Sequence, residues 1–87
     1  MTALTLASRL DLTAAGPLAR DIAAADSLEL DAGGVEFLGG LCLQILLAAA
    51  QDRRRRGLGL TLIGRSDGFD TALAQFGVDP LLLEVAG

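Results

Sequence analysis

The stretch from Asp31 to Arg56 is DAGGVEFLGGLCLQILLAAAQDRRRR, and the rest of the fold is predicted outward from it. Glycine pairs at 33–34 and 39–40 precede an apolar run that is too long for one strand of a small domain, so the run predicts a helix. Four consecutive arginines then place positive charge at the negative end of the helix dipole, and Gly57 supplies the expected stop. This central helix is the element against which shorter elements are expected to pack.

On the N-terminal side of the central helix, a strand, a helix and a second strand are predicted. Leu4–Leu6 and Ser27–Asp31 alternate apolar and polar side chains, as half-buried strands do. Arg9 to Leu12 is expected to be a short connector. Thr13 is then predicted to cap a helix that has Pro17 in or beside its first turn.

On the C-terminal side the alternation continues. Leu58–Ile63 predicts a strand, Ser66 the cap of a helix that ends at Gly77, and Asp79-Pro80 the start of a short terminal turn. Strands that alternate with helices favour right-handed crossovers. The sequence therefore predicts one small α/β domain over residues 1–87, with a mostly parallel or mixed sheet of about four strands and about four helices.

Composition argues against several classes of function. The 87 residues include no His and a single Cys, so no catalytic residues, no metal site and no cofactor are predicted, and the protein is not expected to be an enzyme. A net charge of −4 and an aromatic content of 3% disfavour nucleic-acid binding. The N-terminus lacks the apolar core of a signal peptide, and Leu41–Ala50 is far shorter than the roughly 20 residues that span a bilayer. A cytoplasmic location without membrane insertion is therefore expected.

The central helix has two different sides when each residue turns it by about 100°. One side carries Cys42 and Leu46 and is expected to face the sheet. The other side has Gln44 at its centre, with Leu41 and Leu47 at its border. Apolar residues that border an exposed helix side are candidates for a partner interface, unless another helix of the same domain covers them.

The ordered segments LDLTxA, LELDxxGVEFL and GLGLTLIG resemble the STAS domain, which anti-sigma-factor antagonists share with the cytoplasmic tails of sulfate transporters. The likeness extends from Leu4 to about Leu83. It implies a non-enzymatic module of bacterial signal transduction that binds a protein partner, either a signalling kinase or an anti-sigma factor. The segment GGLCLQILLAA also resembles STAS proteins that accompany bacterial chemotaxis kinases.

The resemblance also implies where the partner binds. In that family a Ser or Thr before the central helix is phosphorylated by a partner kinase, and this position corresponds to Gly40, which has no hydroxyl. The phosphate switch therefore has no acceptor here, and binding is either constitutive or regulated by synthesis and competition. The implied partner-binding residues are Arg9, Asp11, Thr13, Gly39, Gly40, Leu41, Gln44 and Leu47.

Two alternative functions would use the same apolar residues, Leu41 and Leu47, at the border of the exposed helix side. One is a STAS subunit that docks on the ATPase of an ABC transporter for lipids, although that branch normally keeps Thr at the acceptor position. The other is self-association as a homodimer. Both predict a hydrophobic interface that is present at all times. Two further features are expected to be structural, with Cys42 in the core and Arg53–Arg56 as a solvated helix end.

Overall fold

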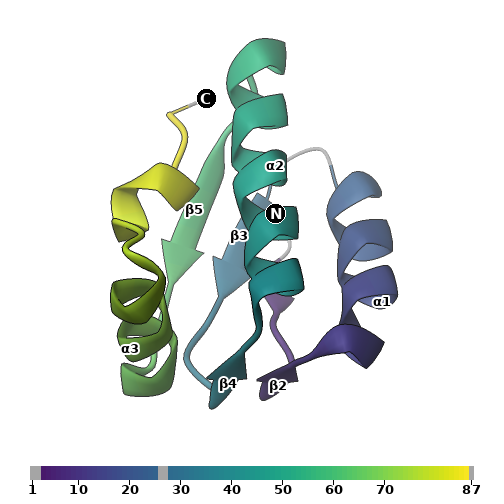
Figure 1. Cartoon of the computed structure of the whole chain (residues 1–87). Coiled ribbons are helices and arrows are strands. Elements are labelled where there is room, and N and C mark those ends of the chain that lie inside the picture. The colour runs from purple at the N-terminus through teal and green to yellow at the C-terminus, as the bar shows by residue number, and fades with distance from the viewer. Residues whose placement is uncertain (1–2, 26–27, 87) are drawn as a thin grey trace.

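The chain forms two layers, a sheet and a set of helices on one of its faces. The computed structural model describes residues 3–25 and 28–86. Figure 1 shows the central helix between the other two. Over the described residues the helices are α1 (Leu12–Ala23), α2 (Gly40–Arg56), α3 (Asp67–Phe76) and the short 3-10 helix η1 (Pro80–Leu83). The strands are β1 (Ala3–Thr5), β2 (Arg9–Leu10), β3 (Leu28–Asp31), β4 (Phe37–Leu38) and β5 (Leu60–Ile63).

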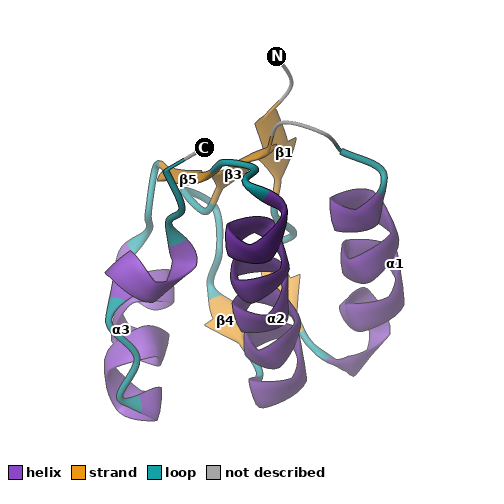
Figure 2. Cartoon of the chain, turned by 90° about the horizontal axis from the view of Figure 1, so that it is seen from above, coloured by secondary structure: helices purple, strands orange, loops and turns teal. Residues whose placement is uncertain are grey.

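The main sheet contains three parallel strands in the order β1-β3-β5. Leu30 pairs with Leu4 on one side and with Leu62 on the other. These residues point toward the helices, whereas their neighbours Glu29 and Asp31 point the other way, because side chains alternate along a strand. Figure 2 shows α1, α2 and α3 on the same side of this sheet. A second parallel pair joins β2 to β4, so the predicted α/β fold with mostly parallel pairing is confirmed.

One hydrophobic core joins all the layers. Leu30 of β3, Leu46 of α2, Phe69 of α3 and Leu83 of η1 each have no exposed surface. Burial of a side chain of this size stabilises the fold by about 1.5–3 kcal/mol. The four residues come from four different elements. The same core therefore fixes the position of α2 relative to its neighbours.

Several helix boundaries were predicted from capping residues and are confirmed. The Ser66 hydroxyl accepts the backbone N–H of Phe69 at the start of α3, and the Asp79 carboxylate caps η1 in the same way. Gly57 and Gly77 end α2 and α3 in the left-handed region, with φ of 70° and 72°. Glycine adopts this conformation without the strain that a Cβ would introduce.

The predicted start of α1 was wrong. Asp11, not Thr13, is the N-cap, and its carboxylate accepts both the backbone N–H and the hydroxyl of Thr13, at 3.1 and 2.7 Å. The helix begins at Leu12, so Pro17 lies beyond the first turn. Asp is the stronger N-cap residue of the two, so the local preference already favoured Asp11.

The strands also differ from the prediction at their ends. β5 begins at Leu60 and not at Leu58, and β3 is described from Leu28, since Ser27 lies outside the described residues. Arg9 and Leu10, expected to be a connector, form β2 against β4. This pairing brings the beginning of α1 next to the beginning of α2.

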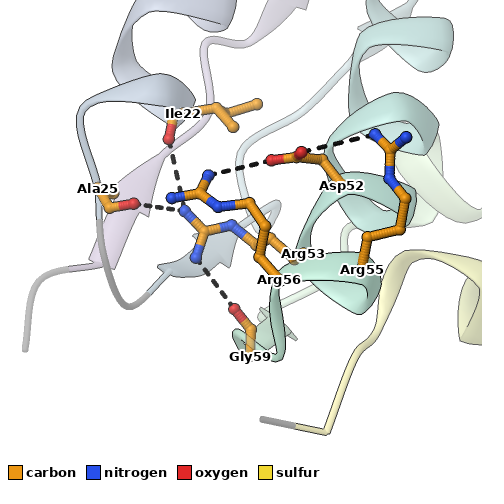
Figure 3. Close-up of polar contacts among 7 residues, drawn as sticks. All are labelled: Ile22, Ala25, Asp52, Arg53, Arg55, Arg56 and Gly59. Carbon is orange, nitrogen blue, oxygen red and sulfur yellow. Dashed lines mark hydrogen bonds and ion pairs between the residues drawn. The ribbon is translucent and has the colours of Figure 1, made fainter.

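Arg53–Arg56 were expected to be solvated, and this expectation was wrong for Arg53. Its side chain is buried, and its guanidinium donates to the backbone carbonyls of Ile22, Ala25 and Gly59 (Figure 3). It thereby ties the end of α1 to the turn after α2. The other three arginines are exposed, as predicted. Four consecutive helical residues point in four directions around the axis, so one of them must face the interior.

Candidate functional site

Two glycines form the start of α2. Gly39 is the N-cap, with no side chain to cap the helix, and its N–H donates to the Leu10 carbonyl at 2.9 Å. A Cβ at position 39 would lie 3.2 Å from the same carbonyl oxygen, so glycine allows the close approach to β2. Gly40 is exposed, and a Cβ there would lie no nearer than 3.8 Å to the Phe76 ring. Position 40 therefore has room for a serine, and its lack of a hydroxyl has no steric cause.

Large apolar side chains are exposed around this helix start. Leu12 is 77% exposed, Phe37 41%, Leu41 44% and Phe76 50%, and they come from α1, β4, α2 and α3. The first three line an apolar cavity of about 230 Å³, and the Phe76 ring lies beside Gly40. These four residues are named the α2 face. A contiguous exposed set of this kind is typical of an interaction surface, whereas scattered exposed leucines are not.

Polar groups lie at one side of the α2 face. The Arg9 guanidinium sits over the Phe37 ring, 5.0 Å from its centroid, and 4.0 Å from the Asp11 carboxylate. The hydroxyl of Thr13 has the largest effect and lowers the pKa of Asp11, and burial has the next-largest effect and raises it. Backbone N–H groups and Arg9 lower the pKa further, so that it is lowered overall. Asp11 therefore remains ionised at neutral pH. An apolar centre with a charged border is the usual anatomy of a protein interface.

The structure brings most of the predicted partner-binding residues together at this place. Arg9, Asp11 and Thr13 lie at the border, and Gly39, Gly40 and Leu41 at the centre. Gln44 is exposed one turn further along α2. Leu47, in contrast, is half-buried and packs against the core, so it presents less surface than expected.

Three residues of the α2 face were not among the predicted site residues. Leu12, Phe37 and Phe76 are single apolar residues within amphipathic segments, and such residues are usually placed in the core. They become neighbours on the surface only when α1, β4 and α3 pack around Gly40. The exposure of Phe76 was the hardest to predict, because its spacing from Phe69 fits the buried side of α3.

The thiol and the hydroxyls near the site have structural partners. Cys42 is 1% exposed, as predicted, and its S–H donates to the Asp11 carbonyl at 3.3 Å. Burial raises the pKa of this thiol, and the nearby Asp11 charge raises it further, which disfavours the reactive thiolate. The Ser66 hydroxyl donates to the Val35 carbonyl. The hydroxyl of Thr13, like that of Ser66, is thus held in a hydrogen bond.

Side chains that could support chemistry are dispersed. Asp31 accepts the N–H of Gly33 within its own turn, and Glu36 is exposed. Within residues 3–25 and 28–86, no group of three or more His, Cys, Asp and Glu side chains is placed to hold a metal ion. None of the helices described in this part of the chain has both the length and the hydropathy needed to cross a bilayer.

Comparison with known proteins agrees with the geometry. The family model described as "Mlab, STAS domain" matches residues 1–84. The solved structure of a sulfate transporter family protein from Wolinella succinogenes superposes with a TM-score of 0.75 at 20% identity, over 92% of this chain and 69% of that chain, which shows a shared fold. No curated protein matches the sequence. The predicted resemblance is confirmed, and the chain belongs to the STAS domain family, whose members are generally non-enzymatic modules of protein interaction and regulation.

Proposed function

We propose that this chain is a regulatory module of bacterial signal transduction, located in the cytoplasm, that binds a signalling kinase or an anti-sigma factor. The observation that carries the proposal is the α2 face, where four large apolar side chains are between 41% and 77% exposed around one helix start. Each would leave water when a partner covers it. Apolar burial of this kind contributes about 25 cal/mol per Å².

The shape of the face favours a protein partner. Its cavity of about 230 Å³ is smaller than the roughly 300–1,000 Å³ of small-molecule pockets, so it suits one inserted apolar side chain. Phe37 and Phe76 supply the aromatic surface that often dominates binding energy. The Arg9–Asp11 pair at the border would orient the partner through its charges.

Regulation by phosphate at the family's usual position is not part of this proposal. Gly40 offers no acceptor, and the hydroxyls of Thr13 and Ser66 are engaged in hydrogen bonds. A phosphate at position 40 would add about two negative charges to an apolar face and would disfavour binding. Without it the module stays competent to bind, and its effect depends on synthesis and on competition between partners.

A second candidate function is a STAS subunit docked on the ATPase of a lipid transporter. The description of the family model, "Mlab", favours this candidate. A hydrophobic face without a phosphate switch also suits a permanent subunit. The two candidates use the same face and differ in the partner that occupies it.

A capture experiment tests the proposal and separates the candidates. Tagged chain is incubated with cytoplasm from its own cells, and bound proteins are identified by mass spectrometry for wild type and for Leu41→Glu. Leu41 lies in the first turn of α2, where a carboxylate favours the helix, so the variant should stay folded. The matched control is Leu81→Glu, because Leu81 is 69% exposed in η1, outside the α2 face.

A kinase or anti-sigma factor that is lost only with Leu41→Glu supports the signalling role. A transporter ATPase lost in the same way supports the second candidate. Equal capture by all three baits would contradict binding through the α2 face.

A further inference from the structure

An exposed arginine lies beside the apolar cavity of the α2 face. Arg9 of β2 is in register with Phe37 of β4, and its guanidinium lies over the Phe37 ring, 5.0 Å from the centroid. The same ring lines the cavity, together with Leu12 and Leu41. An arginine that stacks on an aromatic ring can still use its N–H donors to bind a carboxylate.

The N–H donors of Arg9 are not used within the domain. Over residues 3–25 and 28–86 its guanidinium makes no hydrogen bond, and its one ion pair joins Nε to an oxygen of Asp11 at 4.0 Å, beyond hydrogen-bond distance. The other oxygen of Asp11 accepts both the N–H and the hydroxyl of Thr13, at 3.1 and 2.7 Å. The side chain of Arg9 is 65% exposed. Its two terminal nitrogens are therefore open to a partner.

A guanidinium and an apolar cavity on one aromatic ring favour a particular pair of side chains in the partner. A carboxylate accepts two parallel N–H bonds from a guanidinium, whereas a neutral acceptor gains less from the charge. A lysine or arginine of the partner would instead meet Arg9 as a like charge, which disfavours binding. Arg9 and the cavity share the Phe37 ring, so two residues that are close in a partner's sequence reach both.

We propose that the α2 face recognises a partner segment in which an aspartate or a glutamate is next to a large apolar residue. The apolar side chain fills the cavity, and the carboxylate accepts N–H bonds from the terminal nitrogens of Arg9. The inference rests on the proposed function, because it states the chemistry of the partner that the α2 face binds. Apolar burial supplies affinity for many segments, and Arg9 selects the acidic ones among them.

A net charge of −4 makes this selection local. At long range the chain repels an acidic partner, so its general charge does not attract the segment. The acidic residue is favoured only at the position where it meets Arg9. Loss of Arg9 should therefore remove the acidic preference, whereas loss of another exposed arginine should leave it unchanged.

Peptide selection tests the inference without a purified partner. A displayed library of short random peptides is selected on the immobilised full chain, and enrichment is counted relative to Leu41→Glu. Wild type is expected to enrich peptides in which Asp or Glu adjoins Leu, Ile, Met or Phe. Arg9→Gln should enrich apolar peptides without the acidic preference. Arg55→Gln is the matched control, because Arg55 is also exposed and paired with a carboxylate, that of Asp52, and its loss removes the same charge outside the α2 face.

An enriched peptide is then labelled with a dye, and its affinity is measured by fluorescence polarisation. The amide in place of its carboxylate, or Arg9→Gln in the chain, should each weaken binding by roughly tenfold. Both changes together should weaken it no further, because they remove the same contact. Arg9→Lys should keep part of the affinity, since it keeps the charge and loses the paired donors. Circular dichroism checks that each variant is folded.

An acidic preference that is present in wild type and Arg55→Gln and absent in Arg9→Gln supports the inference. Enriched peptides without an acidic residue overturn it and leave binding through the α2 face intact. A preference that persists in Arg9→Gln also overturns it, because another group would then bind the carboxylate. No enrichment of any peptide over Leu41→Glu would contradict the proposed function and this inference together.

Discussion

Replacement of Arg53 by methionine tests how much the hydrogen bonds of this buried guanidinium contribute to the stability of the fold. The guanidinium bonds to three backbone carbonyls, those of Ile22, Ala25 and Gly59, from a side chain that is almost fully buried. Methionine keeps an unbranched chain along the same path and removes only the donors. The variant therefore isolates the polar contribution from the packing contribution.

The expected loss follows from these three bonds. A hydrogen bond to a charged donor contributes about 1.5–3 kcal/mol, and the Ile22 contact, at 3.5 Å, is at the limit of bonding. The other two bonds together give about 3 kcal/mol or more, from a total stability of about 5–15 kcal/mol. Arg53→Lys should lie between wild type and methionine, because one ammonium nitrogen does not reproduce the spread of the guanidinium donors.

Urea unfolding followed by circular dichroism at the helix band measures this loss, since the chain has no Trp or Tyr for fluorescence. With an m-value near 1 kcal/mol/M, about 3 kcal/mol lowers the midpoint by roughly 3 M. Arg55→Met is the control, because Arg55 is 77% exposed and its ion pair with Asp52 should contribute under about 1 kcal/mol. A midpoint for Arg53→Met that equals the control would refute the structural role of Arg53.

Three further outcomes are expected. Asp11 has a lowered pKa, so its charge stabilises the fold above about pH 3.8, and the urea midpoints of wild type and Asp11→Asn should converge as pH falls through the folded pKa. Cys42 should resist alkylation in native buffer and react only after unfolding, as mass spectrometry would reveal. Gly40→Ser should unfold at the same urea concentration as wild type, within about 0.5 kcal/mol, because a Cβ at that position meets only the Phe76 ring at 3.8 Å.

Local patterns in the sequence were enough to predict the order of elements. The apolar run after Gly40 predicts α2, and the caps Ser66 and Asp79 predict the starts of α3 and η1, because these signals act between residues close in the chain. The pairing of Arg9 and Leu10 with β4, in contrast, is a contact between distant segments. Local signals do not contain that information.

The candidate site was predictable at its centre and at its charged border, but not in its remaining apolar residues. Gly40 was identified through the family resemblance and Leu41 from the helix period, whereas Leu12, Phe37 and Phe76 join them only after three elements have packed. The inward direction of Arg53 was missed although the helix period contains it, because Arg53 lies seven residues after Leu46 and points in nearly the same direction. Its partners, the carbonyls of Ile22 and Ala25, come from a distant segment and have no local signal.

Chemical-shift mapping measures directly whether a partner binds through the α2 face. The isotope-labelled chain is titrated with the purified partner from the capture experiment, and amide shifts are followed residue by residue. We expect the amides of Leu12, Phe37, Gly40, Leu41 and Phe76 to shift most, and we expect Leu41→Glu to remove these changes while Leu81→Glu keeps them. Shifts concentrated on the helix-free side of the main sheet, with the amides around Gly40 unchanged, would contradict binding through the α2 face.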